Sequence, residues 1–165
     1  MSETLAKFVV ALSFEDLSES VIKAVKKCIL DTVGCAILGS TVDEGQRVRS
    51  AVADFDHSRD ATIWGTSQMS SVPFAALVNG TAAHSRELDD ACAFLHPGAV
   101  IIPAVFAVAE KNRSSGKAVI TSIVAGYEIM IRLSEAMGSR SQYDRGWHPT
   151  GTCGAFGSAA AVAKL

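Results

Sequence analysis

The clearest helical pattern in the chain covers residues 22–37, which read IKAVKKCILDTVGCAI. Its apolar side chains recur every three or four residues, which is the spacing of a helix that buries one face. These positions are Ile22, Val25, Ile29, Val33 and Ile37.

The same spacing occurs earlier in the chain, between Leu5 and Leu12. Ser13 and Asp16 lie between the two periodic segments in the arrangement of a capping box, and Gly39 is a typical helix stop. The first forty residues therefore predict a helical hairpin.

The rest of the chain also favours helices. Pro73 suits the first turn of a helix, and Ser115 is a typical N-cap. The nearly apolar run after Pro97 predicts a helix that is buried on several sides. A short strand is expected over residues 61–65, and a polar loop is expected after residue 137. Helices are expected over residues 44–55, 72–84, 97–108, 115–137 and 154–165. The predicted fold class is all-α.

Composition limits the possible partners. The chain has 165 residues, 48% hydrophobic and 19% charged, which is enough for one folded domain with a real core. Fifteen basic residues oppose 17 acidic ones without a basic cluster, so we expect no nucleic-acid partner. The most apolar runs, residues 99–109 and 118–131, are shorter than a bilayer requires, so we expect no membrane partner.

The four cysteines form no C-x-x-C pair, and the N-terminus lacks the pattern of a signal peptide. We therefore expect a reducing, cytoplasmic setting. Cys28 and Cys35 share one face of the predicted helix, which favours buried, inert thiols over catalytic nucleophiles. Phosphate-binding loops of the G-x-x-x-x-G-K and G-x-G-x-x-G types are missing.

The C-terminal segment is rich in Gly, Ala and Ser and predicts a helix that packs closely against its neighbours. It reaches Leu165 without a capping residue. We therefore interpret residues 1–165 as the N-terminal part of a larger helical domain, truncated at this point.

One polar cluster interrupts two apolar helices between His84 and Pro97. Carboxylates beside a histidine can have their pKa values driven apart for acid and base work. The structural alternatives are equally plain: the aspartates can cap a helix or pair with Arg86, and His96 can be a hydrogen-bonded core residue. The charged members of this cluster are His84, Arg86, Glu87, Asp89, Asp90 and His96.

A second polar cluster, residues 145–152, leads directly into the Gly/Ala-rich segment. Free backbone N–H groups at a helix start, together with the helix dipole, favour a bound carboxylate. Arg145, His148, Thr150 and Thr152 belong to this cluster. His148 has the same structural alternative as His96, and His57 lies in a polar run typical of the surface.

A metal site is the remaining specific alternative for the first polar cluster. His84, Asp89, Asp90 and His96 offer nitrogen and oxygen ligands, but their spacing matches none of the compact zinc motifs and no thiolate joins them. We therefore expect no metal, and a metal-dependent hydrolase would be revealed by the metal content of the protein.

Several motifs in order resemble the MmgE/PrpD family, which includes 2-methylcitrate dehydratase and cis-aconitate decarboxylase. The resemblance covers the whole chain, and its motifs are residues 5–9, 30–36, 75–83, 84–97 and 148–160. Family members are more than twice as long, so the resemblance covers their N-terminal portion.

The resemblance implies an all-helical domain that full-length relatives join to an α+β lid, in a homodimer, with the site between the two domains. It implies no cofactor. The implied chemistry is proton transfer at a carbon next to a carboxylate of a small polycarboxylate, followed by loss of water, loss of carbon dioxide or inversion. A lysine-containing segment that relatives use lies beyond the residues of this chain.

On this basis we assign His96 and His148 as acid/base groups, oriented by Asp89 or Asp90. Either aspartate could also transfer a proton itself if burial raises its pKa. The acidic group of the family site corresponds to Glu87, Asp89 and Asp90. The residues assigned to substrate binding are Arg86, Glu87, Thr150 and Thr152; among them, Arg86 and the helix start near residues 150–154 suit substrate carboxylates.

The family pattern is not matched everywhere: relatives commonly carry Asp at the position of Glu87 and Thr at that of Ala91. These departures keep an epimerase or isomerase open beside a dehydratase or decarboxylase. A non-catalytic helical module that acts through a subunit interface is the third possibility.

Overall fold

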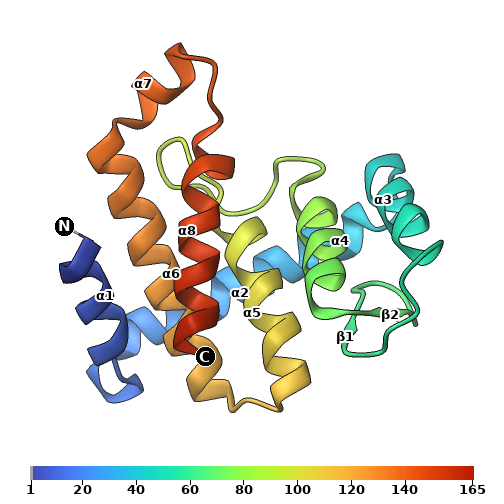
Figure 1. Ribbon diagram of the computed structural model, residues 1–165, viewed down its shortest axis with the longest axis horizontal. Coiled ribbons are helices and arrows are strands. Elements are labelled where there is room, and N and C mark those ends of the chain that lie inside the picture. Colours follow the sequence, from blue (N-terminus) through green and yellow to red (C-terminus); the bar gives the residue numbers. More distant parts are fainter. Residues whose placement is uncertain (1) are drawn as a thin grey trace.

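The computed structural model describes residues 2–165 and confirms the all-α class. Eight α-helices account for most of the described chain, with one 3₁₀ turn and one two-stranded sheet (Figure 1). The elements are α1 (Ser2–Ala11), the 3₁₀ turn η1 (Phe14–Asp16), α2 (Glu19–Gly39), α3 (Asp43–Ala53), β1 (Ala61–Thr62), β2 (Met69–Ser70), α4 (Val72–His84), α5 (Pro97–Asn112), α6 (Gly116–Met137), α7 (Ser139–Asp144) and α8 (Pro149–Lys164).

The first forty residues form the expected pair of helices, with a more detailed connection. The capping box of Ser13 and Asp16 starts η1, in which Asp16 accepts hydrogen bonds from the backbone N–H and the hydroxyl of Ser13. Ser18 then caps α2 by accepting from the N–H of Val21. Gly39 is the last residue of α2, as expected. A glycine is also required there by packing, because an added Cβ would overlap the carbonyl oxygen of Ala82 on α4.

The core is built around α5, which contacts α4 on one side and α6 and α8 on the other (Figure 1). The expectation that this helix is deeply buried is confirmed, because Ile101, Ile102 and Val105 are fully buried. Ile123 and Met130 of α6 complete the same cluster. The helices are therefore held mainly by aliphatic packing on α5.

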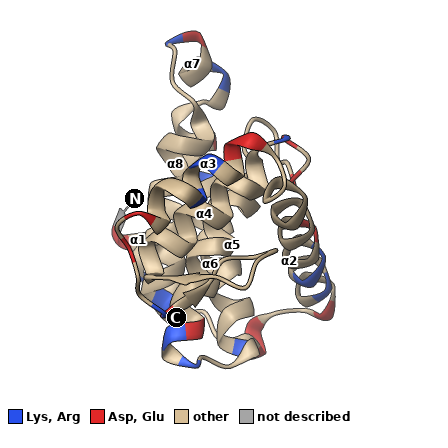
Figure 2. Ribbon diagram, turned by 90° about the vertical axis from the view of Figure 1, so that its right-hand side faces the viewer, with Lys and Arg blue, Asp and Glu red and all other residues tan. Residues whose placement is uncertain are grey.

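Charged residues lie at the edges of this arrangement. In Figure 2, α2, α3 and α7 each carry side chains of both signs, whereas α4 carries no Lys, Arg, Asp or Glu. Among the residues that the structure describes, no helix combines the length and the apolar character needed to cross a membrane.

The close packing expected of the C-terminal helix is confirmed where α8 crosses α6. A Cβ added to Gly157 would lie 2.8 Å from the Cβ of Met130 and 3.1 Å from the carbonyl oxygen of Gly126. A Cβ added to Gly126 would lie 2.8 Å from the Cβ of Ala161. Both glycines are needed because the two helix backbones approach too closely for side chains.

We expect Gly157→Val to lower the free energy of unfolding by about 1–3 kcal/mol, because the added side chain forces α6 and α8 apart. Gly34→Ala in α2 is the matched control: nothing lies within 4 Å of its Cβ position, so alanine should be neutral or stabilising. Urea unfolding followed by circular dichroism measures both. Equal stability of Gly157→Val and the wild type would contradict this packing.

Several boundaries differ from the sequence prediction, among them the end of the helix expected over 97–108, which extends to Asn112. The helix expected over 44–55 spans Asp43–Ala53, and the strand expected over 61–65 is reduced to Ala61–Thr62, paired antiparallel with Met69–Ser70. The partner strand was not predicted. Asp56 holds this hairpin to the start of α4, accepting from the hydroxyl of Ser70 at 2.5 Å and from the N–H of Ser71 at 2.7 Å. These donors hold the pKa of Asp56 well below its ordinary value.

Two further expectations were wrong near the C-terminus. The segment expected to be a loop after residue 137 contains the short helix α7, Ser139–Asp144. The last helix begins at Pro149 rather than Gly154. The added first turn contains Gly151, which disfavours a helix by propensity, but Pro149 suits a first helical turn and Thr150 and Cys153 are buried, so packing overrides propensity there.

Candidate functional site

Three helix ends meet at one place, and each carries a histidine. His84 is the last residue of α4, His96 is the N-cap of α5, and His148 is the N-cap of α8. His96 and His148 each precede a proline, which excludes the helical conformation at the histidine and turns it out of the helix that follows. The repeated His-Pro pair is therefore the local reason that both imidazoles stand at helix entrances.

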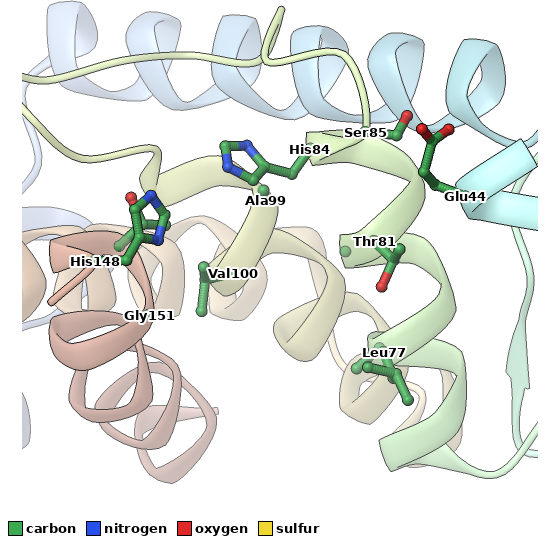
Figure 3. Close-up of a pocket in the computed structure, with 12 residues that line it drawn as sticks. Glu44, Leu77, Thr81, His84, Ser85, Ala99, Val100, His148 and Gly151 are labelled. Carbon is green, nitrogen blue, oxygen red and sulfur yellow. The ribbon is translucent and has the colours of Figure 1, made fainter. Parts of the chain in front are cut away.

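The three imidazoles are close to one another. The ring centroid of His84 lies 4.8 Å from that of His96 and 6.1 Å from that of His148. Figure 3 shows His84 and His148 pointing into the same space between α4 and α8, beside Val100 of α5. Tyr143 of α7 lies on the other side of His148, with ring centroids 5.8 Å apart.

Asp89 joins two of these rings. Its Oδ1 lies 3.0 Å from Nδ1 of His84 and 3.4 Å from Nδ1 of His96. Nδ1 of His96 also lies 3.3 Å from the carbonyl oxygen of Asp89. The Asp89 side chain is completely buried, and its Oδ2 has no hydrogen-bond partner among the described residues. Asp89 therefore fixes the orientation of both rings and leaves each Nε2 on the far side from the carboxylate.

The hydrogen bond to Asp89 is the main cause of a raised pKa at His84. Burial acts in the opposite direction, and the negative charges of Asp89 and Glu87 add to the increase. His84 is thus the imidazole that holds a proton more readily than an exposed histidine.

Asp90 faces away from the imidazoles. It accepts a hydrogen bond from the N–H of Gly98 at 2.9 Å and another from the hydroxyl of Tyr127 at 2.9 Å. Gly98 permits this approach, because a Cβ there would overlap Oδ1 of Asp90 and the hydroxyl of Thr32. Burial raises the pKa of Asp90 and that of Tyr127. The structure thus places Asp90 as a link between the loop, α5 and α6, and gives contact with the histidines to Asp89.

The loop over residues 85–96 is anchored at its far end. Cys92 and Leu95 exchange two backbone hydrogen bonds, of 2.9 and 3.0 Å, and the Leu95 side chain is buried in the main core. The backbone N–H of His96 then donates to the hydroxyl of Thr150 at 3.1 Å. These contacts fix the second imidazole relative to α8 although 54 residues separate the two partners.

The remaining residues assigned to substrate binding lie in different surroundings. Arg86 and Glu87 are exposed; Arg86 is 3.9 Å from Glu44 of α3, and Glu87 has a positive φ of 49°. The Thr152 hydroxyl donates to Gln142 at 2.7 Å. Of the four residues, Thr150 is the one that lies beside the imidazoles.

A pocket of about 520 Å³ opens between α4, α5 and α8. Its volume is in the range of small-molecule sites, and its walls are mainly apolar with a few polar groups, as is usual for such sites. Among the described residues, its lining comprises Glu44, Ala76, Leu77, Gly80, Thr81, His84, Ser85, Ala99, Val100, His148, Thr150 and Gly151. His84 and His148 therefore face it directly, and His96 lies next to His84.

Sequence reasoning did not assign His84 to the site, although it placed this residue in the polar cluster. Its sequence signal was its place at the end of an apolar helix, directly before the acidic residues. Tyr127 lies within the helix expected over residues 115–137, and no sequence signal pairs it with Asp90. Cys28 and Cys35 are half-buried, and burial raises the pKa of each thiol, which disfavours a thiolate nucleophile. His57 is exposed, as expected.

His84, Asp89 and His96 are also the residues that could hold a metal ion, because one donor atom of each lies within 4.8 Å of the others. Two imidazoles and a carboxylate suit a divalent transition metal. In this arrangement, however, Oδ1 of Asp89 lies at hydrogen-bonding distance from Nδ1 of His84 and near Nδ1 of His96, so these three atoms already contact one another without an ion.

We therefore expect the purified protein to contain well below one equivalent of zinc, iron or manganese, and to be unchanged by a chelator. Elemental analysis of the natural protein measures the metal content. A stoichiometric metal that survives dialysis, and is lost in His84→Gln, would contradict the expected metal-free site.

A family model that describes the MmgE/PrpD N-terminal domain matches residues 3–165. The chain belongs to the MmgE/PrpD family. This confirms the resemblance read from the sequence motifs.

Curated relatives of this MmgE/PrpD chain include the cis-aconitate decarboxylase-like protein oryM of Aspergillus oryzae, 31% identical over 98% of the chain and 35% of its own length. Cis-aconitate decarboxylase of Homo sapiens is 29% identical over 100% of the chain and 36% of its own length. The Aspergillus terreus enzyme of the same name is 30% identical over 93% of the chain and 33% of its own length. The MmgE/PrpD chain thus spans about a third of the length of these relatives.

Proposed function

We propose that the complete protein is a cofactor-independent lyase that acts on a small polycarboxylate by proton transfer at a carbon next to a carboxylate. The observation that carries this proposal is the meeting of His84, His96 and His148 from three helix ends, with Asp89 between two of them. The names of the relatives, cis-aconitate decarboxylases, support the same substrate class.

His96 and His148 are the acid/base groups of this proposal. A neutral imidazole takes the proton from the carbon, and an imidazolium returns a proton to the product or to the leaving group. Asp89 holds Nδ1 of His96, so Nε2 is the nitrogen left free for proton transfer. His148 lies at the mouth of the pocket, where its ring is exposed.

The first turn of α8 is the proposed binding place for one substrate carboxylate. Thr150 and Gly151 line the pocket, and the first backbone N–H groups of a helix have no partner within the helix. Thr152, Arg86 and Glu87 remain further candidates for substrate contact, the last two from the exposed loop. A homodimer and a cytoplasmic location are also part of the proposal; light scattering after gel filtration tests the dimer.

The proposed reaction is tested by incubating the natural protein, treated with chelator, with a panel of di- and tricarboxylates in deuterium oxide and recording proton NMR spectra. We expect deuterium at a carbon beside a carboxylate, with loss of water or carbon dioxide. Exchange without either loss would identify an epimerase or isomerase, the alternative that Glu87 and Ala91 keep open. If no acid of the panel exchanged a proton or was converted, the proposal of an enzyme would be contradicted and a non-catalytic helical module would be favoured.

A further inference from the structure

His84 occupies the centre of the histidine cluster and faces the pocket, yet the proposed proton transfer does not use it. We propose that His84 is a binding residue for a substrate carboxylate, which it holds as an imidazolium through Nε2–H. This inference rests on the proposed function for the substrate class and adds the group that recognises it.

The position of His84 supports this role. Its ring lines the pocket, 4.8 Å from the ring of His96 and 6.1 Å from that of His148, so an anion bound to it lies beside both proposed acid/base groups. Figure 3 shows the ring projecting from the end of α4 toward His148. A carboxylate held there would bring its neighbouring carbon toward the groups that move its proton.

The charge balance of the pocket supports it too. No Lys or Arg side chain is among the described residues that line the pocket, and Glu44 adds a negative charge at its edge. Arg86, which does not line the pocket, lies 3.9 Å from Glu44. The histidines are therefore the groups in this lining that can neutralise a polycarboxylate.

Asp89 determines which histidine carries the charge. Its Oδ1 is closer to Nδ1 of His84, at 3.0 Å, than to Nδ1 of His96, at 3.4 Å. One carboxylate stabilises one imidazolium, and a second positive ring 4.8 Å away would be repelled. Both conditions, one stabilised imidazolium and no second positive ring beside it, are met when His84 is the cation and His96 is the neutral base.

The buried position of Asp89 keeps its negative charge from the ligand. The Asp89 side chain is completely buried, whereas 27% of the His84 side chain is exposed. An incoming carboxylate therefore meets the N–H edge of the imidazolium rather than the aspartate. The charged groups around His84 are Asp89 and Glu87 from its own loop, His96 from α5, His148 from α8 and Glu44 from α3.

The test uses tricarballylate, a tricarboxylate without a hydroxyl group or double bond, and isothermal titration calorimetry on the natural protein. We expect His84→Gln to weaken its binding by about tenfold or more, the usual effect of losing a charge-assisted hydrogen bond. His57→Gln, an exposed histidine outside the pocket, should bind as the wild type does. Circular dichroism and thermal unfolding check that each variant is folded.

The pH dependence of binding is the second measurement. The imidazolium is lost as pH rises, and the pKa of His84 is raised, so wild-type affinity should fall as pH rises above the ordinary histidine value of about 6.5. His84→Gln should remove this fall, and His148→Gln should leave it in place. A flat wild-type profile, or an affinity unchanged in His84→Gln, would overturn the inference.

The two proposals fail in different ways. Binding that depends on His84 without any deuterium exchange would leave this inference standing and overturn the lyase. Exchange on a polycarboxylate with unchanged binding in His84→Gln would overturn this inference alone. A wild-type protein that neither binds nor exchanges any acid of the panel would overturn both.

Discussion

Replacing either His96 or His148 with alanine should lower the turnover of the natural protein by about a hundredfold or more, the usual contribution of a general acid or base. Each ring is expected to move a proton on the reacting carbon, and alanine offers no group that can do so. Turnover of the acid identified by NMR, measured at saturating substrate, checks both variants.

The two variants should fold normally, which makes the loss of turnover interpretable. Neither His96 nor His148 caps its helix through its side chain, so alanine removes no helix-capping bond. His57→Ala is the matched control and should retain full turnover. Variants of His96 and His148 that turn over at the wild-type rate would rule out both assignments.

The second large effect separates two adjacent aspartates. We expect Asp89→Asn to lower turnover by roughly a hundredfold, because the amide removes the charge that supports the His84 imidazolium and holds His96 in one tautomer. The NH₂ group of the asparagine, if it replaced Oδ2, would have no hydrogen-bond acceptor there, because Oδ2 has no hydrogen-bond partner among the described residues. The protein should remain folded.

Asp90→Asn should show the reverse pattern. It weakens the bonds from Gly98 and Tyr127, so the free energy of unfolding should fall by about 1–3 kcal/mol while turnover per folded molecule is largely kept. Urea unfolding and turnover, measured on the same samples, distinguish the two aspartates. Equal loss of turnover in both variants would contradict the division of roles between them.

Much of the fold follows from local sequence patterns. The three-to-four spacing over residues 22–37 gives α2, Pro73 and Ser115 mark helix starts, and the apolar run after Pro97 gives the buried helix α5. The rest depended on packing. The first turn of α8 forms despite Gly151 because Thr150 and Cys153 are buried there, which helix propensity does not foresee.

The candidate site divides in the same way. Residue types at short spacings are enough to predict the helical class, the family resemblance and the two polar clusters that hold His96 and His148. The choice between Asp89 and Asp90 as the residue that contacts the imidazoles depends on the three-dimensional path of the loop. Two identical neighbours are indistinguishable by pattern, and the loop direction that separates them is set by bonds to Tyr127 and Thr150, 37 and 54 residues away from their partners.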